Sequence, residues 1–578
     1  MRNKKLVIIA LSIIFLLTNN HKPKADYINL TGAQLSSTIA EYYVDDDGIT
    51  LKLEIGERDQ NAFRKLIDGD EDEREGYLRN IYKILDDTGN TLAGNVKLVE
   101  TRKRVERPSP FKKYPGNKKP SELVKHVEVE YRFNKKPVSL TFNPPVDEKG
   151  MILASIGFIV YHKLIPVIDF RFLAPNPKLN LDWNDPWYSK FENRTMKRHH
   201  ESSLMSFLYI EPFEVRHEIL LRLKDMENWI DLGIKDSDKI DLEQQQIIKQ
   251  KLAEFFLKRN ELKIDGQAAK PIVDRVQFVQ ANLMGIQVLE NEESIDYLSS
   301  LVGIILAYVT DGIPNEVSVD WDMFSEKIQR IPTNAIDPAG PFPSYVLPDD
   351  NVVVWKNFLK NYKIPEVSAV MIDESKLKIK VPVISTFLLL FLLTYVYVQW
   401  KRLRDKKSVY YVCVVGIVFI ILSLPFFNVS INNPLLSYSH LNKRDSEFLI
   451  NNLLKNVYRS FDFKNEEDIY DKLAVSLDGD LLRDIYIQTK KGMEIVKQGG
   501  ARAKVKSVEL KEFNSKPLQG EFGYQYHCIW NVSGTVEHWG HRHVRTNQYE
   551  ANLIIKPIEN RWKITDIDLI EEKRIKPI

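Results

Sequence analysis

Cysteine is almost absent from this chain, which has only 2 cysteines in 578 residues. Cys413 lies inside an apolar run, and Cys528 lies far downstream in a region of alternating polarity, so we expect no disulfide between them. An exported chain without disulfides must be stabilised by burial of apolar surface. Low cysteine content is more typical of a bacterial periplasm than of a eukaryotic cell surface.

An excess of either charge is also missing, because 81 Lys and Arg oppose 79 Asp and Glu. No overall field therefore favours nucleic acid, and we expect no nucleic-acid partner. The one basic concentration, Arg102–Lys119, is interrupted by prolines and is predicted to be a loop. It could contact an anionic membrane surface or an acidic partner, or it could be a solvated hairpin loop.

Several enzyme signatures are absent. The sequence contains neither a Gly-x4-Gly-Lys-Ser/Thr phosphate loop nor a Gly-x-Ser-x-Gly nucleophile elbow. His217-Glu218 begins like a zinc-protease helix, but Leu221 stands where the second histidine is required. We therefore expect a protein that is not an enzyme, with catalysis in a pocket of the C-terminal domain as the alternative.

Two long apolar runs, Val381–Trp400 and Val409–Phe427, flank a short basic connector at 401–408. Each run has about the 20 residues needed to cross a hydrocarbon core of about 30 Å. Short Lys/Arg-rich loops remain cytoplasmic, so both large flanking regions are predicted to be periplasmic. The sequence thus predicts an integral protein of the bacterial inner membrane, anchored by a transmembrane hairpin.

The N-terminus has the layout of a secretory signal over residues 1–25. Basic residues (Arg2, Lys4, Lys5) precede the apolar stretch Leu6–Thr18 and a polar segment that ends at Ala25. Pro23 occupies a position where a small residue is expected before cleavage. An uncleaved anchor therefore remains the alternative, which gives two or three membrane spans in total.

Two β-rich domains are predicted before the apolar runs. Strict alternation at Ile49–Ile55, Val127–Phe133 and Val138–Phe142 indicates an antiparallel β-sandwich-like domain over 26–178. A second β-rich domain is predicted over 195–370, with one amphipathic helix at Asp241–Arg259. Its predicted strands are Leu204–Ile210, Val215–Leu223, Val276–Phe278, Leu301–Val309 and Glu316–Phe324.

Two loops are rich in rigid residues. Leu181–Tyr188, in the linker between the β-rich domains, combines tryptophan, tyrosine and aspartate, and Ile336–Asp350 contains four prolines with Phe342 and Tyr345. Rigid aromatics in loops can anchor a partner. For the first loop the favoured interpretation is a domain junction, and for the second it is a covered or edge loop.

The region after the apolar runs changes character. Helical spacing predicts helices at Asp445–Phe461, Asn465–Leu477 and Asp480–Lys497. Four strands follow, at Val505–Phe513, Phe522–His538, His541–Ile555 and Trp562–Ile570. This layout over 440–572 resembles the cystatin/NTF2-like α+β fold, whose concave face can enclose a pocket.

Three histidines cluster at the predicted hairpin between the second and third of these strands. Counting by twos along both strands places His538, His541 and His543 on the apolar face of the sheet, at its rim. Three imidazoles in one patch could bind zinc, nickel or copper. The alternative is a solvated or carbonyl-bonded hairpin tip, since a bulge would scatter the register.

The whole chain resembles an uncharacterised family of bacterial exported inner-membrane proteins. The resemblance rests on Ala25–Ala33, Phe158–Lys163, Phe207–Arg216 and the hairpin His538–His543. It implies no particular activity. We therefore expect a membrane-anchored periplasmic protein for binding or assembly, with protein partners in the envelope. Transition-metal handling by the histidine cluster is the alternative function.

Overall fold

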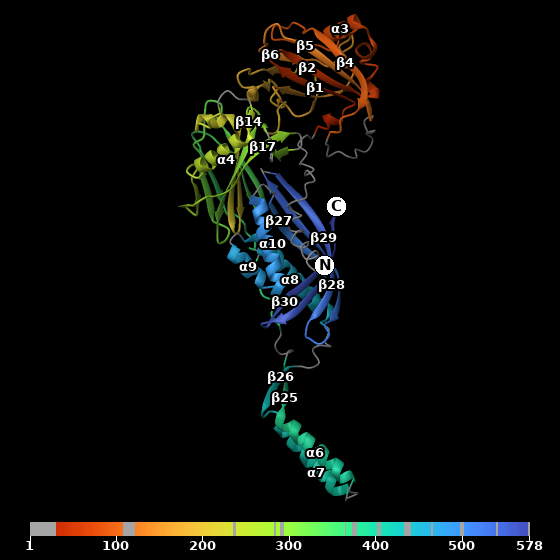
Figure 1. Ribbon diagram of the computed structural model, residues 1–578, viewed down its shortest axis with the longest axis vertical. Coiled ribbons are helices and arrows are strands. Elements are labelled where there is room, and N and C mark those ends of the chain that lie inside the picture. The colour runs from red at the N-terminus through yellow and green to blue at the C-terminus, as the bar shows by residue number, and fades with distance from the viewer. Residues whose placement is uncertain are drawn as a thin grey trace.

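The computed structural model describes residues 31–107, 122–234, 239–282, 285–289, 294–364, 366–372, 378–401, 406–432, 441–463, 466–497, 502–538 and 541–575. The N-terminal segment 1–25, predicted to be a signal peptide or anchor, lies outside these residues. Within them, three apolar cores succeed one another along the chain, and a helical arm projects beyond the last domain (Figure 1).

The first domain packs two sheets around one apolar core. Its elements are η1 Ala33–Leu35, β1 Thr38–Asp45, β2 Gly48–Ile55, η2 Glu57–Asp59, α2 Arg64–Asp68, α3 Glu71–Asn80, β3 Ile84–Leu85, β4 Gly94–Lys103, β5 Leu123–Arg132, β6 Ser139–Phe142, β7 Ile156–His162, β8 Ile165–Pro166, β9 Arg171–Phe172, β10 Lys178–Asn180 and β11 Lys190–Phe191. The larger sheet has the order β4-β5-β2-β1-β7-β8, with β9 paired to β7, and the smaller has β11-β10-β6-β3. The strands predicted from alternation at Ile49–Ile55 and Val127–Phe133 are confirmed as β2 and β5.

The second domain also packs a seven-stranded and a four-stranded sheet around its own core, and it has a further two-stranded sheet. Its elements are η3 Pro186–Tyr188, β12 Leu204–Glu211, β13 Glu214–Arg222, η4 Lys224–Asn228, β14 Lys239–Asp241, α4 Leu242–Phe256, β15 Leu262–Ile264, β16 Gln267–Ala268, β17 Ile272–Asn282, β18 Gly285–Val288, β19 Ser294–Asp296, β20 Leu301–Val309, β21 Glu316–Asp320, β22 Ile331–Asp337, β23 Gly340–Val346 and β24 Val352–Lys356. The predicted helix is confirmed as α4, which begins at a capping box of Asp241 and Gln244. It buries Ile248, Leu252 and Phe256 on one stripe.

The two domains share one topology, which marks the second as a structural repeat of the first. The central order β4-β5-β2-β1-β7-β8 corresponds strand by strand to β17-β20-β13-β12-β22-β23. In both, only the β1–β7 or β12–β22 pair is parallel, and the other four pairs of neighbouring strands are antiparallel. In the smaller sheets, β10-β6-β3 corresponds to β24-β21-β15. The β1–β2 and β12–β13 hairpins are each closed by a turn of two residues.

The proline-rich loop Ile336–Asp350 forms mainly the hairpin β22–β23 at the edge of the larger second sheet. Pro341 and Pro343 lie within the edge strand β23, where Phe342 and Tyr345 are exposed. Proline has no backbone N–H, so these residues reduce the capacity of the edge to pair with another strand. The interpretation as an edge segment is therefore confirmed.

The C-terminal domain places helices on one face of a four-stranded antiparallel meander (Figure 1). Its elements are α8 Lys443–Arg459, η6 Ser460–Asp462, α9 Glu466–Ala474, α10 Gly479–Lys497, β27 Arg502–Pro517, β28 Tyr524–His538, β29 His541–Ile558 and β30 Arg561–Ile575. Helix α8 buries Leu449, Leu453 and Val457, the spacing from which it was predicted. The order of three helices and four strands predicted from the sequence is therefore confirmed.

The predicted transmembrane hairpin is wrong, and with it the prediction of an integral membrane protein with two or three spans. Within the described ranges, no helix has both the length and the apolar character required to span a bilayer. Two helices do form here, α6 Val383–Lys401 and α7 Lys406–Ser423.

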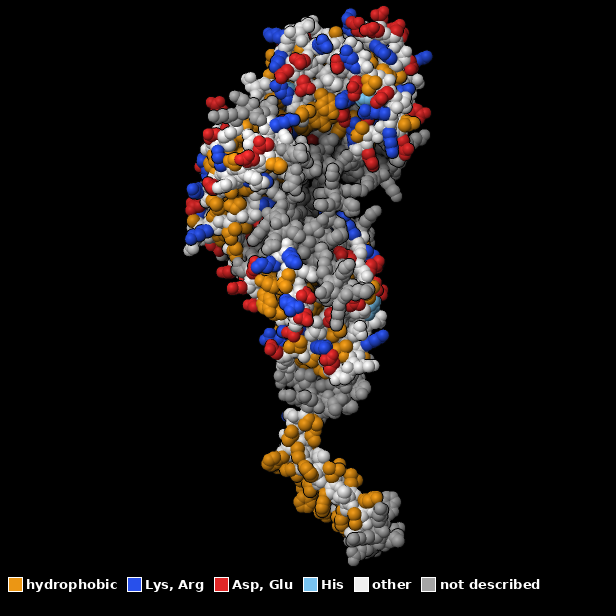
Figure 2. Space-filling view, in the orientation of Figure 1, with side chains coloured by type: hydrophobic (Ala, Val, Ile, Leu, Met, Phe, Trp, Pro, Cys, Tyr) orange, Lys and Arg blue, Asp and Glu red, His pale blue; other side chains and the backbone are white. Residues whose placement is uncertain are grey.

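The predicted spans were too long because their ends take other conformations. Val381 and Pro382 pair in the ribbon of β25 Lys378–Pro382 and β26 Asn428–Asn432, and Leu424–Phe427 lies in a turn. The apolar part of α7, 409–423, is thus about 22 Å long at helical rise, against a hydrocarbon core of about 30 Å. Apolar side chains such as Phe387 and Phe391 remain exposed along this arm (Figure 2).

Candidate functional site

The linker between the first two domains carries the most prominent cluster of charged and aromatic residues that the structure brings together. Trp187 lies at its centre, in the short helix η3, whose N-cap is Asp185. Its buried indole packs with Ile165 of the first domain and with Leu220 and Leu301 of the second. The segment Leu181–Tyr188 is therefore a domain junction, as predicted, and Trp187 is part of the shared core.

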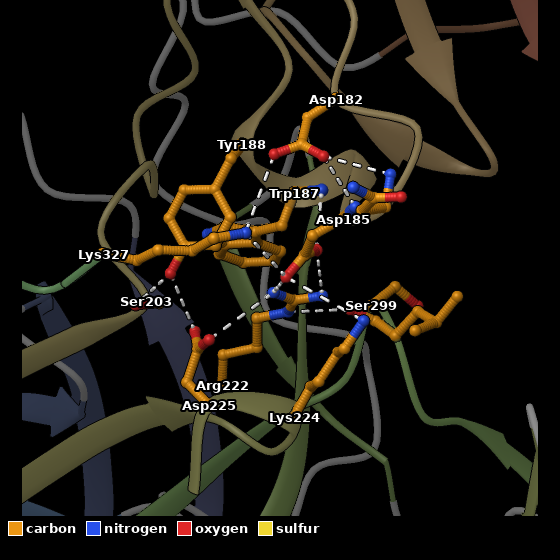
Figure 3. Close-up of polar contacts among 12 residues, drawn as sticks. Asp182, Asp185, Trp187, Tyr188, Ser203, Arg222, Lys224, Asp225, Ser299 and Lys327 are labelled. Atoms are coloured by element: carbon orange, nitrogen blue, oxygen red, sulfur yellow. Dashed lines mark hydrogen bonds and ion pairs between the residues drawn. The ribbon is translucent and has the colours of Figure 1, made fainter. Parts of the chain in front are cut away.

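Arg222, at the end of β13, joins the second domain to this linker (Figure 3). Its guanidinium donates two parallel hydrogen bonds to Asp185, with Nη1–Oδ2 at 2.8 Å and Nη2–Oδ1 at 2.7 Å. A third donor, Nε, bonds the carbonyl oxygen of Leu298 at 2.9 Å. Arg222 is 0 % exposed, so a bidentate ion pair is held inside the protein at the junction.

A second buried arginine also lies against the indole of Trp187. The guanidinium carbon of Arg198 lies 4.2 Å from the Trp187 ring centroid, and that of Arg222 lies 5.1 Å away. Arg198 donates to the carbonyl oxygens of Pro166, Trp187 and His200, at 2.8, 3.0 and 3.2 Å. Burial lowers the pKa of Arg198 to about 10. Trp187 is thus contacted by two cations, one tied to the first domain and one to the second.

The charges around Asp185 extend the pair into a network. Lys224 and Lys327 lie 4.0 and 3.9 Å from its Oδ2 atom. Burial opposes ionisation of Asp185, but the hydrogen bonds and charge of Arg222 outweigh it and hold the pKa of Asp185 below its ordinary value. Burial raises the pKa of the neighbouring Asp225, whose Oδ2 accepts a bond from the Tyr188 hydroxyl at 3.2 Å. Asp185 is therefore the bidentate partner of Arg222, and its ionised form is favoured by that contact.

Two serine–histidine pairs in the described chain have the distance of a nucleophile and its base. Ser189 Oγ lies 2.7 Å from His162 Nδ1, and Ser206 Oγ lies 2.9 Å from His217 Nε2. All four residues are buried. Burial lowers the pKa of His162 to about 4 and that of His217 to about 3, so both imidazoles are neutral at pH 7. Each hydrogen bond satisfies one ring nitrogen, and the other one, His162 Nε2 or His217 Nδ1, is buried without a hydrogen-bond partner.

The predicted metal ligands lie at a hairpin whose backbone is described up to the turn. His538 pairs directly with His541, and Val536 pairs with His543, without a bulge between β28 and β29. The side chains of these three histidines lie outside the described part of the chain, so the metal site remains a prediction. Among the described side chains, no group of three or more His, Cys, Asp or Glu could hold a metal ion.

Arg198 and Arg222 were missed by the sequence analysis, although a signal for Arg222 exists. It follows the apolar run Ile219–Leu221 in a strand that is buried along its whole length. A charged residue in such a strand requires a buried partner, and Asp225 and the aspartates of the linker were candidates. Arg198 has no comparable signal, because it bonds backbone carbonyls in an irregular segment.

Comparison with known proteins identifies no family for this chain. No protein-family model and no curated protein matches it. Among solved structures, the intermembrane space region of the chloroplast protein ARC6 matches with 15% sequence identity. The match covers 23% of this chain and 98% of that one, with a TM-score of 0.18. A score this low supports no structural or functional conclusion.

Replacing Arg222 with Ala should strongly destabilise the junction. The change leaves the Asp185 carboxylate buried without its partner, which typically costs about 3–5 kcal/mol. Urea unfolding of the full chain measures this loss. As a matched control, Lys178→Ala breaks the exposed Lys178–Glu192 pair and should cost about 1 kcal/mol or less. Equal losses in the two variants would contradict the assignment.

Proposed function

We propose that this chain is an exported, non-enzymatic interaction protein. Its first two domains are fixed together and bind a protein partner as a single unit. The observation that carries the proposal is the closed junction around Trp187. Its central ion pair, between Arg222 and Asp185, is buried and bidentate, and Arg222 also lies against the Trp187 ring. Such a junction serves to fix two repeated domains relative to one another.

Export to the bacterial periplasm is part of the same proposal. It is supported by the signal-like layout of residues 1–25 and by the resemblance to an uncharacterised family of exported bacterial proteins. Alkaline phosphatase fused after residue 578 should be active in bacterial cells, because the enzyme matures only after export. An inactive fusion, present at normal abundance, would contradict the proposed location.

Exposed apolar residues of the first two domains are the expected contact points for a protein partner. A photo-crosslinking amino acid placed at Leu164 or Phe342 should give discrete adducts in cells, since both side chains are at least half exposed. Glu192, an exposed charged position, serves as the control and should give few adducts. The same adduct pattern at all three positions would argue against a specific binding surface.

A transition-metal-handling role is the second candidate. It is supported by the unbroken register of β28 and β29, in which His538, His541 and His543 occupy positions of the same parity as Cys528 and Ala551. Residues of one parity share a face, so three imidazoles would meet at the hairpin. Such a site would supply nitrogen ligands suited to zinc, nickel or copper.

Metal content tests this candidate directly. The full chain, purified without a histidine tag, should contain about one equivalent of metal by mass spectrometry. The triple variant with Ala at His538, His541 and His543 should lose it, whereas His527→Ala should retain it. His527 is the matched control because it contacts Asn552 and Glu550 instead. Wild-type protein without metal would eliminate the site.

A further inference from the structure

The smaller sheets of the two repeated domains differ at one edge. In the first domain, β11 is the outermost strand and pairs with β10, so the order is β11-β10-β6-β3. In the second domain, β24 occupies the place of β10 but is itself the outermost strand, and none of the described strands corresponds to β11. The repeat therefore contains a strand position that is filled in the first domain and open in the second.

The filled position shows how the fold holds an extended segment there. Phe191 of β11 pairs with Leu179 of β10, and the backbone N–H of Glu192 donates to the carbonyl oxygen of Lys178 at 2.9 Å. The Phe191 side chain is buried, with its ring centroid 6.2 Å from that of Phe142. A short segment thus completes this sheet through backbone hydrogen bonds and one apolar side chain.

The chain takes a different course after the open edge. In the first domain it turns through η3 after β10 and returns as β11. After β24, residues 358–364 form no helix or strand, and the chain continues to the C-terminal domain, where Asn456 donates to the carbonyl oxygen of Ser368 at 2.7 Å. Because the side chain of Val354 in β24 is exposed, the open position is accessible to another molecule.

The backbone of β24 presents unpaired groups on this open side. The backbones of Asn351 and Asn357, which flank β24, are hydrogen-bonded toward β21 at 2.9 and 2.8 Å. Hydrogen-bonded residues alternate along an antiparallel ladder, so the odd-numbered residues of β24 face β21. The N–H and C=O groups of Val352, Val354 and Lys356 therefore point away from the sheet. They form the template on which a further strand pairs.

The side chains along the open edge are apolar where those of the filled edge are polar. Val352, Val354 and Phe358 are 39 %, 51 % and 80 % exposed, and their parity places them on one side of the strand. The equivalent side of β10 carries Lys178 and Asn180 instead. Exposed apolar side chains in a row along an open edge are typical of a binding surface.

The second domain protects one of its edges and leaves this one unprotected. The edge strand β23 contains Pro341 and Pro343, which cannot donate a backbone hydrogen bond. Strand β24 contains no proline, has no charged residue before Lys356, and pairs with β21 without a bulge. Natural edge strands usually carry such protection, so its absence in β24 indicates an edge that is used.

We propose that the open edge of β24 binds an extended segment of a partner protein, which adds to the four-stranded sheet as a fifth strand. The segment has apolar side chains at alternate positions, which cover Val352 and Val354, and no proline where it pairs. A second copy of β24 fits less well, because it pairs through five residues, whereas a standard interface uses about 20–30 residues on each side. This binding mode rests on the proposed function, since it specifies where an interaction protein holds its partner.

Photo-crosslinking along the edge tests the strand addition in bacterial cells that express the full chain. A photo-crosslinking amino acid is placed at Val352 or, separately, at Lys356, and the adducts are mapped by mass spectrometry. Both positions should label one linear segment of one partner, at residues about four apart, because paired strands advance together. Labelled residues without this spacing, or adducts to β24 of a second copy, would overturn the proposal.

Two variants at Val354 separate backbone pairing from general stickiness of the edge. Val354→Pro removes an outward N–H without breaking a bond to β21, so adducts at Val352 should fall by about tenfold or more. Val354→Thr keeps the N–H and the β-branched shape and should stay within about threefold of wild type. Both variants should keep the urea midpoint of the wild type. Equal adduct yields in the two would contradict strand addition.

The probes at Leu164 and Phe342 distinguish failure of this proposal from failure of the proposed function. If those positions give adducts while Val352 and Lys356 give none, the chain binds a partner elsewhere and strand addition to β24 is wrong. If none of the four positions gives adducts, the proposed interaction function fails as well.

Discussion

The contact of Trp187 with two buried guanidinium groups is the interaction on which the arrangement of the first two domains depends. Arg198 binds carbonyls of the first domain and the linker, and Arg222 ends a central strand of the second. Asp185 neutralises Arg222 with two hydrogen bonds. Because the indole is part of an apolar core drawn from both domains, neither domain can rotate without exposing it and separating the ion pair.

The two domains share one fold but use its equivalent surfaces for different contacts. In the first domain, Arg107 bridges Glu41 and Glu54 on the outer face of the large sheet, at 2.7 and 2.6 Å. In the second, the corresponding face receives Trp187 instead. At the hairpin turns, the first domain has exposed aspartates, whereas the second presents Phe213 to the C-terminal domain. The same hairpin therefore ends in an exposed, charged turn in the first domain and in an interdomain contact in the second.

Much of the fold could be predicted from the sequence, because period-two alternation determines which strand residues are buried. The linker segment Leu181–Tyr188 was also predicted to be a junction from its rigid aromatics. The duplication was not predicted, because most equivalent residues of the two hairpins differ: Glu41 and Tyr42 of β1, for example, correspond to Phe207 and Leu208 of β12. The partner of Arg222 could not be predicted either, because Asp185 is distant from it in the sequence. The transmembrane hairpin was wrong because hydropathy alone did not show where helix gives way to strand and turn.

The most direct test is the distribution of distances between the first and second domains, measured by electron spin labels at an exposed site in each. A junction closed by Arg222 and Trp187 predicts one narrow distribution in the wild-type chain. Arg222→Ala should give a broad one while each domain keeps its own fold. A broad distribution in the wild type, or an equally narrow one in the variant, would show that this junction does not fix the two domains.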